Sequence, residues 1–412
     1  MSAAADDRRA VMVERAFRSL PARYLGAPPG FDATYQIRLG DLGHCWEVRL
    51  DAHGARVRRG ASRRAPDVIL GTDSATWLEL RESELSGVQA FSERRLYARG
   101  NLDLAVGFEG MFRRSGGRDP LLRIHDVEVG SLRLSTLTMG EGPDLLLIHG
   151  LGATKASFFD TAAALSDSYR VHAIDLPGFG SSSKPATAPY NAGYFADAIL
   201  GAMDTMGIER AHIGGNSLGG RVAIETALRA PTRVRSLGLL CPAVAFVRRG
   251  YHPLVRVLRP EFGLLPHAFG RERVARVFWS LFADADAIDP SVVDVVVDEF
   301  RRIYGSAGGR LAFLAAARNV YLDRPDGEQG FYERLSRLQP PALFVWGSHD
   351  RLISHRFARH VENSLPGVEQ IVIGRCGHVP QVEHPLQTNG LLTRFFARAD
   401  ALDAPARVRV AA

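Results

Sequence analysis

A chain of 412 residues is longer than one ordinary domain, so we expect two or three compact units. Hydrophobic residues make up 46% of the chain and charged residues 23%, the balance of a globular protein. No apolar run reaches the roughly 18 residues that a membrane-spanning helix needs. The net charge of +6 comes almost entirely from arginine, and no nucleic-acid-binding motif accompanies it, so we expect no nucleic-acid partner.

The N-terminal residues carry acids at Asp6 and Asp7 and lack the apolar stretch of a signal peptide, which predicts a cytoplasmic protein. The three cysteines, Cys45, Cys241 and Cys376, are odd in number and have no CxxC spacing. They therefore indicate neither a disulfide framework nor a zinc site, and Cys376 is best interpreted as a free buried thiol. We expect no cofactor and no metal ion.

Arginine doublets occur early in the chain, at Arg58-Arg59, Arg63-Arg64 and Arg113-Arg114. Free doublets of this kind attract anionic lipid head groups, although arginines on exposed turns are more often simply solvated. A transient contact with an anionic membrane surface is therefore one expected interaction. The sequence leaves the oligomeric state open.

A break between two patterned regions lies at residues 115–120, Ser-Gly-Gly-Arg-Asp-Pro, where flexible and turn-forming residues cluster. We place the domain boundary there, with one domain over residues 1–118 and a second over residues 119–400. In the first domain, residue patterns predict strands at 35–39, 45–50, 55–58, 68–70 and 95–99, and helices that begin near Asp73 or Ser74 and at Leu102. This smaller domain is expected to be α+β.

Residues 31–113 resemble the sterol-carrier (SCP2-like) lipid-binding domains. The resemblance lies in "PDVILGTDSATWLELRESE", in "RRLYARGNLDLAVGFEGMF" and in the meander before them. Domains of this family enclose an apolar tunnel that holds fatty acyl chains or sterols. The candidate lining residues are Trp77, Leu80, Leu104, Val106 and Phe108, and for any single one of them ordinary core packing is the favoured interpretation.

In the second domain, short apolar strands alternate with helices. The strands are predicted at 132–138, 145–148, 171–174, 212–214, 237–240 and 343–346. Such alternation predicts an α/β fold with a doubly wound, mostly parallel sheet. Residues of about 245–335 interrupt the alternation and look helical, with a helix start at Asp289 and Pro290, so we expect a helical lid inserted into the fold.

The candidate nucleophile is Ser217, in Gly215-Asn-Ser-Leu-Gly219. This G-x-S-x-G sequence follows an apolar strand and opens a predicted helix, which is the context of a nucleophile elbow. The turn is so sharp that side chains two residues on either side of the serine would collide, which explains both glycines.

A serine needs a base to remove its proton, and the base needs a carboxylate to orient it. His378 is the candidate base, on a loop after a strand at 371–373, with His384 as the competitor. Asp350 follows the strand at 343–346 and lies between Ser217 and His378 in the chain, as the order of nucleophile, acid and base requires. The rival carboxylate, Asp175, precedes the serine and is expected to stabilise its own turn.

The sequence His149-Gly-Leu-Gly152 follows the strand at 145–148. Its glycines allow backbone N–H groups to turn toward the reacting carbonyl oxygen, so we expect the amides of Leu151 and Leu218 to form an oxyanion hole. His149 itself is expected to be structural.

Taken in order, HGLG, DLPGFGSSSKP, GNSLGG, WGSHD and GHVPQVEHP resemble the α/β-hydrolase superfamily over residues 131–242 and 337–398. The resemblance implies a serine hydrolase that cleaves carboxylic esters, and together with the SCP2-like region it implies a lipophilic acyl substrate. Carbon–carbon bond hydrolysis or cofactor-free peroxidation by the same triad is an alternative, although HGLGATK departs from the HGGGPG of ring-fission hydrolases. A lipid-binding or transfer protein with a scaffolding hydrolase domain is the other alternative.

Overall fold

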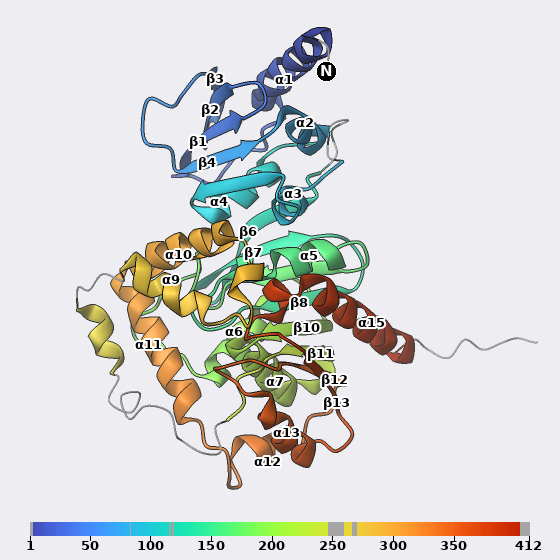
Figure 1. Ribbon diagram of the computed structural model, residues 1–412. Helices are drawn as coiled ribbons and strands as arrows, with labels where there is room; N and C mark the ends of the chain where they lie inside the picture. The colour runs from blue at the N-terminus through green and yellow to red at the C-terminus, as the bar shows by residue number, and fades with distance from the viewer. Residues whose placement is uncertain are drawn as a thin grey trace, which may run out of the picture. The chain divides into compact units, whose positions relative to one another are not determined.

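The computed structural model describes residues 3–82, 84–114, 117, 119–245, 259–265 and 270–403 (Figure 1). The chain divides into two compact units, Met1–His125 with Leu137–Gly140, and Asp126–Thr136 with Glu141–Ala412. The domain boundary that the sequence predicts between residues 118 and 119 stays a prediction.

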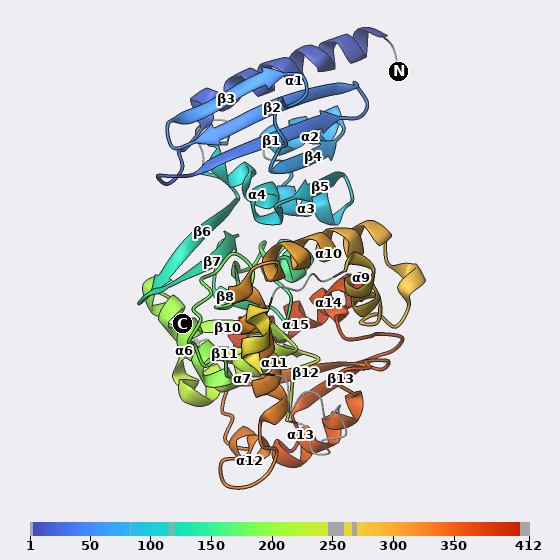
Figure 2. The same cartoon turned by 90° about the vertical axis from the view of Figure 1, so that its left-hand side faces the viewer.

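The N-terminal unit is an α+β domain built on a five-stranded sheet of order β3-β2-β1-β4-β5 (Figure 2). The sheet is mixed, because β1 runs parallel to β4 and antiparallel to β2. The elements are α1 (Ala3–Arg23), β1 (Asp32–Leu39), β2 (His44–Asp51), β3 (Gly54–Arg59), β4 (Val68–Thr72), α2 (Ser74–Glu82), α3 (Gly87–Ser92), β5 (Leu96–Gly100), α4 (Leu102–Gly107) and η1 (Glu109–Met111).

Aromatic side chains fill the interior of this unit. Phe17 on α1 stacks on Trp46 of β2 and on Trp77 of α2, with ring centroids 4.3 and 4.5 Å apart. Phe108 continues the cluster toward Tyr35, at 4.9 Å. Trp77 and Phe108, two of the candidate tunnel residues, are therefore buried among other rings, while Leu80 is only partly buried.

Two of the predicted basic doublet residues are paired with acids rather than free. Arg58 forms an ion pair with Glu47 at 3.2 Å, and Arg59 forms one with Glu14 at 3.8 Å. This pairing reduces the positive charge that the doublet offers to a membrane surface, and a membrane contact stays a prediction. In the described residues, no helix is both long enough and apolar enough to span a bilayer.

The second unit is built on an eight-stranded sheet of order β13-β12-β11-β10-β8-β9-β7-β6, in which β9, β8, β10, β11, β12 and β13 pair in parallel. Its strands are β6 (Leu122–Val129), β7 (Leu132–Met139), β8 (Asp144–Ile148), β9 (Arg170–Ile174), β10 (Ala211–Asn216), β11 (Val234–Leu240), β12 (Ala342–Gly347) and β13 (Glu369–Ile373). The doubly wound, mostly parallel sheet is confirmed.

Helices cover both faces of this sheet (Figures 1 and 2). Two of them, α6 (Ala192–Thr205) and α7 (Leu218–Arg229), pack against one another on one face, and α5 (Phe159–Leu165) and α15 (Pro385–Asp403) pack on the other. The remaining short elements are η3 (Lys155–Phe158), η4 (Pro231–Arg233), η7 (His355–Phe357), α13 (Ala358–Ser364) and α14 (Pro380–Glu383).

The insertion between β11 and β12 is helical wherever the structure describes it. Its elements are η5 (Pro260–Leu264), α9 (Arg271–Trp279), η6 (Ala285–Ala287), α10 (Pro290–Tyr304), α11 (Ala307–Leu322) and α12 (Phe331–Leu335). The predicted start of α10 is confirmed, because the Asp289 carboxylate accepts the Ser291 N–H at 2.9 Å and Pro290 occupies the first turn. Parts of the expected lid, residues 246–258 and 266–269, lie outside the described residues.

Candidate active site

The candidate site lies at one edge of the parallel sheet. Because the carboxyl ends of parallel strands point the same way, the loops after β8, β10, β11 and β12 meet there. Gly150, in the loop after β8, lies against Ser217 so closely that an added Cβ would come 3.3 Å from the Cβ of the serine. The first expected contact, between the HGLG loop and the nucleophile, is therefore present.

Ser217 stands at the turn between β10 and α7, partly exposed, with φ 53° and ψ −115°. This strained backbone is possible because of its neighbours: a Cβ on Gly215 would lie 2.4 Å from the backbone of Gly219, and a Cβ on Gly219 would lie 1.9 Å from the carbonyl oxygen of Ile148. The N–H of Ser217 donates to the Leu240 carbonyl at 2.9 Å, which ties the turn to the end of β11. The geometry is that of a nucleophile elbow.

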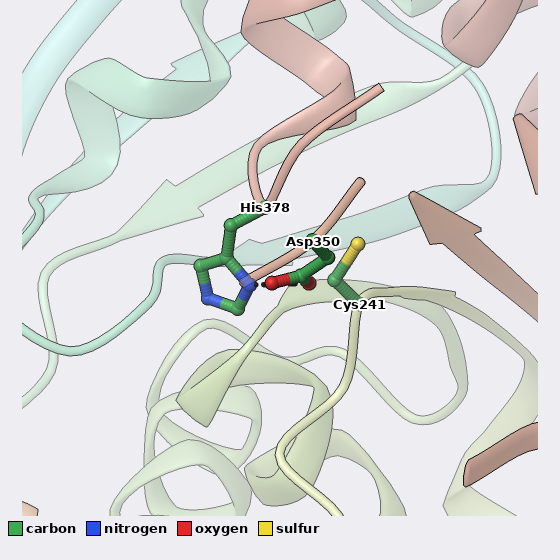
Figure 3. Close-up of side chains that lie close together, drawn as sticks. All are labelled: Cys241, Asp350 and His378. Carbon is green, nitrogen blue, oxygen red and sulfur yellow. Dashed lines mark hydrogen bonds and ion pairs between the residues drawn. The ribbon is translucent and has the colours of Figure 1, made fainter. Parts of the chain in front are cut away.

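His378 and Asp350 form a buried pair (Figure 3). The Nδ1 of His378 lies 2.7 Å from an Asp350 carboxylate oxygen, and the other oxygen accepts the N–H groups of Leu352 and Ile353 at 2.8 and 2.9 Å. Because the carboxylate is fixed by these bonds, Nδ1 carries the proton and Nε2 keeps its lone pair. The ring is thus prepared to accept a proton at Nε2.

Ser217 and His378 are joined through Asn216. In the described part of the chain, the Ser217 hydroxyl makes no hydrogen bond to the His378 ring. The Asn216 side-chain amide instead donates to the backbone carbonyls of Leu240 and His378, at 3.1 and 3.0 Å. The residue beside the serine thus holds the loop that carries the histidine, and serine–base bonds of this kind often tighten only when substrate binds.

The two expected oxyanion donors have no competing acceptor. Among the described residues, neither the N–H of Leu151 nor that of Leu218 makes a hydrogen bond to backbone or side chain. Leu218 is the first residue of α7, where a helix leaves its N–H groups unpaired and carries partial positive charge. Both amides are therefore available to a negatively charged oxygen beside Ser217.

The rival residues have other partners. Asp175 is fully buried and bonds Lys155 at both the backbone N–H, at 2.7 Å, and the ammonium, at 2.8 Å. Burial opposes ionisation of Asp175, but Lys155 outweighs it and lowers the pKa of the carboxyl. His149 accepts the Leu176 N–H at Nε2, and His384 is bonded to the Arg375 carbonyl. These residues stabilise turns and contribute nothing to the pair at His378.

Two clusters bring sulfur, carboxylate and imidazole groups within 4.8 Å of one another: Cys241 with Asp350 and His378 (Figure 3), and Cys376 with Glu383 and His384. Burial, reinforced by Asp350, raises the pKa of the Cys241 thiol, and burial raises that of Cys376 to about 12. Both therefore stay thiols, which bind metal ions weakly. The carboxylates already accept hydrogen bonds, so the donor sets suit a metal ion poorly.

The comparison with known families follows this geometry. A family model described as "alpha/beta hydrolase fold" matches residues 143–385, more than half of the chain, and the "SCP-2 sterol transfer family" model matches residues 26–113. The protein is an α/β-hydrolase. It carries an SCP2-family domain at its N-terminal end, and both resemblances inferred from the sequence are confirmed.

Relatives of this α/β-hydrolase act on different bonds. It is 29% identical to 2-hydroxymuconate semialdehyde hydrolase of Pseudomonas putida, over 67% of this chain and 95% of that protein. It is 28% identical to pimeloyl-[acyl-carrier protein] methyl ester esterase of Aeromonas hydrophila, over 64% of this chain and 99% of that one. A solved membrane phospholipase A, described as a bacterial virulence factor, has a TM-score of 0.58 at 28% identity, over 68% of this chain and 87% of that one. The comparisons show a hydrolase without naming its substrate.

One residue of the site escaped sequence reasoning. Glu383 accepts the N–H of Gly377, next to His378, at 2.6 Å through one oxygen, and the N–H groups of Ala283 and Asp284 at 2.7 and 3.1 Å through the other. The N–H of His378 also donates to the carbonyl of Leu281 at 2.7 Å. The inserted segment 281–284 of the hydrolase is therefore bonded directly to the histidine loop. The only sequence signal was an acid five residues after a loop histidine.

Proposed function

We propose that this hydrolase cleaves carboxylic esters of a lipophilic acyl substrate through an acyl-enzyme on Ser217, with Asp350 and His378 completing the catalytic triad. The observation that supports this most is the buried hydrogen bond from His378 Nδ1 to Asp350, because it leaves Nε2 free to act as a base.

In the proposed reaction, the Ser217 oxygen attacks the ester carbonyl and its proton passes to His378 Nε2. The negative charge on the carbonyl oxygen is stabilised by the N–H groups of Leu151 and Leu218. Collapse of this intermediate breaks the bond to the alcohol, which leaves with the proton from His378. A water molecule then repeats the sequence on the acyl-enzyme, releases the carboxylic acid and returns Ser217 to its starting state.

Two observations favour a lipophilic ester. The relatives include an enzyme named as a methyl ester esterase and one named as a phospholipase A. The SCP2-family match adds a domain of a lipid-binding family to the same chain. Neither observation depends on the geometry of the site.

The test is a panel of p-nitrophenyl esters with acyl chains from two to sixteen carbons, the longer ones dispersed in detergent, together with labelling by a fluorophosphonate. We expect labelling at Ser217, loss of labelling in Ser217→Ala, and kcat/KM that rises with chain length. Labelling without turnover of any ester would contradict the proposal.

A second candidate function is hydrolysis of a carbon–carbon bond by the same triad, favoured by the similarity to 2-hydroxymuconate semialdehyde hydrolase. The enzyme would be offered that ring-fission product beside the esters, with loss of its absorbance as the readout. Turnover of the ring-fission product with no turnover of esters would replace the first proposal by this one. Cofactor-free peroxidation has no observation in its favour here.

We further propose that residues 1–118 form a lipid-binding domain that raises the concentration of substrate near the hydrolase domain. A tether of a few residues can hold a ligand at an effective concentration of roughly millimolar. The proposal predicts that removing residues 1–118 lowers kcat/KM for a long-chain ester more than for a short soluble one. An equal loss on both esters would leave the domain a structural role. Lipid binding with no hydrolysis of any kind would favour the alternative of a transfer protein.

A further inference from the structure

The N-terminal unit contains a small cavity in which basic and apolar side chains meet. About 20 Å³ of it is accessible to the centre of a water molecule, enough for one or two oxygen atoms. Its lining includes four arginines, Arg23, Arg81, Arg113 and Arg114, together with Leu80 and Phe112. Such a concentration of guanidinium groups around one small cavity indicates an anion as its occupant.

Arg81 is the decisive residue, because it is buried and two of its guanidinium nitrogens have no hydrogen-bond partner among the described residues. Only 4% of its surface is exposed, and among the described residues neither its Nε nor its Nη2 has a hydrogen-bond acceptor. Among the described residues Arg81 forms no ion pair, although the charges of Glu82 and Glu109 act on it from a longer distance, and the ring of Phe112 lies 5.3 Å from its Cζ. Burial, reinforced by Arg23, lowers the pKa of Arg81 to about 9, and a guanidinium with this pKa is still charged at neutral pH.

The neighbouring acid, Glu109, compensates the charge of Arg81 only in part. Glu109 also lines the cavity, but it accepts the backbone N–H of Gly87. Burial raises the pKa of Glu109 to about 7, so that the carboxyl is only partly ionised at neutral pH. Arg23, in turn, donates to the backbone carbonyls of Arg113 and Arg81, at 2.7 and 3.1 Å, and so fixes the wall of the cavity.

We propose that this cavity binds the carboxylate group of an amphiphile, with Arg81 donating to its oxygens. A guanidinium presents parallel N–H groups that match the two oxygens of a carboxylate, and a carboxylate fits the available volume better than the larger phosphate group. Leu80, Leu85 and Leu121 share the lining and supply an apolar surface for the chain that follows the head group.

The inference deepens the proposed function and rests on it in one respect, the identity of the amphiphile. Hydrolysis of a lipophilic ester releases a carboxylic acid, which is ionised at neutral pH. The cavity would therefore retain the acid product of the reaction, whereas a neutral ester could accept a hydrogen bond from Arg81 but would bring no opposite charge.

The experiment measures binding to the full chain carrying Ser217→Ala, so that no ligand is turned over. Hexadecanoate, 1-hexadecanol and inorganic phosphate are titrated separately by calorimetry, below the concentrations at which the first two aggregate. We expect hexadecanoate to bind at least tenfold more tightly than the alcohol, and phosphate to bind no better than the alcohol. Equal affinity for the acid and the alcohol would overturn the proposal, as would tighter binding of phosphate.

Arg81→Met then separates a ligand-binding role from a structural one. If Arg81 binds the ligand, Arg81→Met should lose the preference for the acid over the alcohol. The melting temperature of the ligand-free variant should stay the same or rise, because an incompletely compensated buried charge has been removed. Arg99→Gln is the matched control: Arg99 is an exposed arginine of the same unit, on β5. A preference for the acid that survives in Arg81→Met would contradict the assignment, and if that variant does not fold, the comparison of acid with alcohol in the parent still decides.

The two proposals fail separately. Ester hydrolysis by a chain that shows no preference for the carboxylate would overturn the cavity assignment alone. Carboxylate binding that depends on Arg81, in a chain that hydrolyses no ester, would overturn the proposed function alone.

Discussion

Glu383 is the residue whose substitution tests the site most directly. Its carboxylate accepts three backbone N–H groups, one from Gly377 beside the proposed base and two from the inserted segment at Ala283 and Asp284. In Glu383→Gln, the amide can accept on one side only, and on the other its NH2 group faces N–H donors. Hydrogen bonds to a charged group contribute about 1.5–3 kcal/mol each, and neutral ones about 0.5–1.5 kcal/mol. Losing one and weakening two should therefore cost about 3.5–6 kcal/mol locally.

Part of this loss should appear in catalysis, because Gly377 precedes His378 and has little freedom to move. A Cβ on Gly377 would lie 2.1 Å from the carbonyl oxygen of Leu281, so the loop is in close contact with the insertion. A displacement of about 1 Å in a catalytic group can lower the rate by roughly a hundredfold. We expect kcat for a short soluble ester to fall about ten- to a hundredfold in Glu383→Gln, with KM changed less than threefold, as a misplaced base predicts.

The control lies between the same two segments. Arg375 forms an ion pair with Asp284 at 2.9 Å, but its side chain is 81% exposed, and exposed pairs contribute about 0–1 kcal/mol. Arg375→Gln should therefore keep kcat within about twofold. The reasoning is refuted if folded Glu383→Gln, checked by circular dichroism and thermal unfolding, has the kcat of the parent, or if Arg375→Gln loses as much activity.

Three further outcomes are expected. Ser217→Ala should abolish hydrolysis and leave the melting temperature nearly unchanged; appreciable turnover by the purified variant would disprove the nucleophile. Asp350→Asn should lower kcat far more than Asp175→Asn does. Asp175→Asn should instead destabilise the fold by about 3–5 kcal/mol, because it leaves Lys155 buried without a counter-charge. The reverse ranking in turnover and in urea denaturation would make Asp175 the catalytic acid and Asp350 the structural one. Burial raises the pKa of Glu109 from 4.5 to about 7, so this carboxyl keeps its proton to higher pH in the folded chain than in the unfolded one, and the free energy of unfolding falls as pH rises from 4.5 to 7. Glu109→Gln should therefore raise the free energy of unfolding by about 1–3 kcal/mol at pH 8 and leave it unchanged at pH 4. An equal gain at both pH values would contradict the raised pKa of this carboxyl.

The elements that the sequence predicts well are those with a strong local pattern. The apolar strands predicted for the second unit are all present, and the helix predicted to open at the G-x-S-x-G sequence is Leu218–Arg229. Runs of buried β-branched and aliphatic residues bounded by glycine identify such strands without knowledge of the fold. The long helix Ala3–Arg23 was not predicted: its three buried apolar residues, Val13, Phe17 and Leu20, lie among many charges, and the stacking of Phe17 on two tryptophans could not be foreseen.

Some residues of the candidate site could likewise be predicted from local sequence patterns, and others could not. Ser217, Asp350 and His378 are each preceded by a strand and stand in a fixed order, so they can be found from the chain alone. Glu383 and Arg81 differ, because what matters in each is its surroundings in the fold: the amides of residues 283 and 284 for Glu383, and the cavity lined by three other arginines for Arg81. No local pattern distinguishes a glutamate that binds amides from one that faces solvent, or a buried arginine from an exposed one.

We expect the insertion to set the substrate preference of this chain. The insertion leaves the sheet after β11 and returns at β12, the strand that precedes Asp350, and its segment 281–284 is bonded to the histidine loop. The nucleophile elbow and the two expected oxyanion amides lie outside the insertion, at the loop after β8 and at the start of α7. Relatives of this chain are named for ester hydrolysis and for ring-fission hydrolysis, and one fold hosts different reactions through the residues grafted onto it. For this chain, the bond that is broken should accordingly be decided by residues 259–335, and exchanging that segment with a relative's should change substrate preference while Ser217 remains the labelled residue.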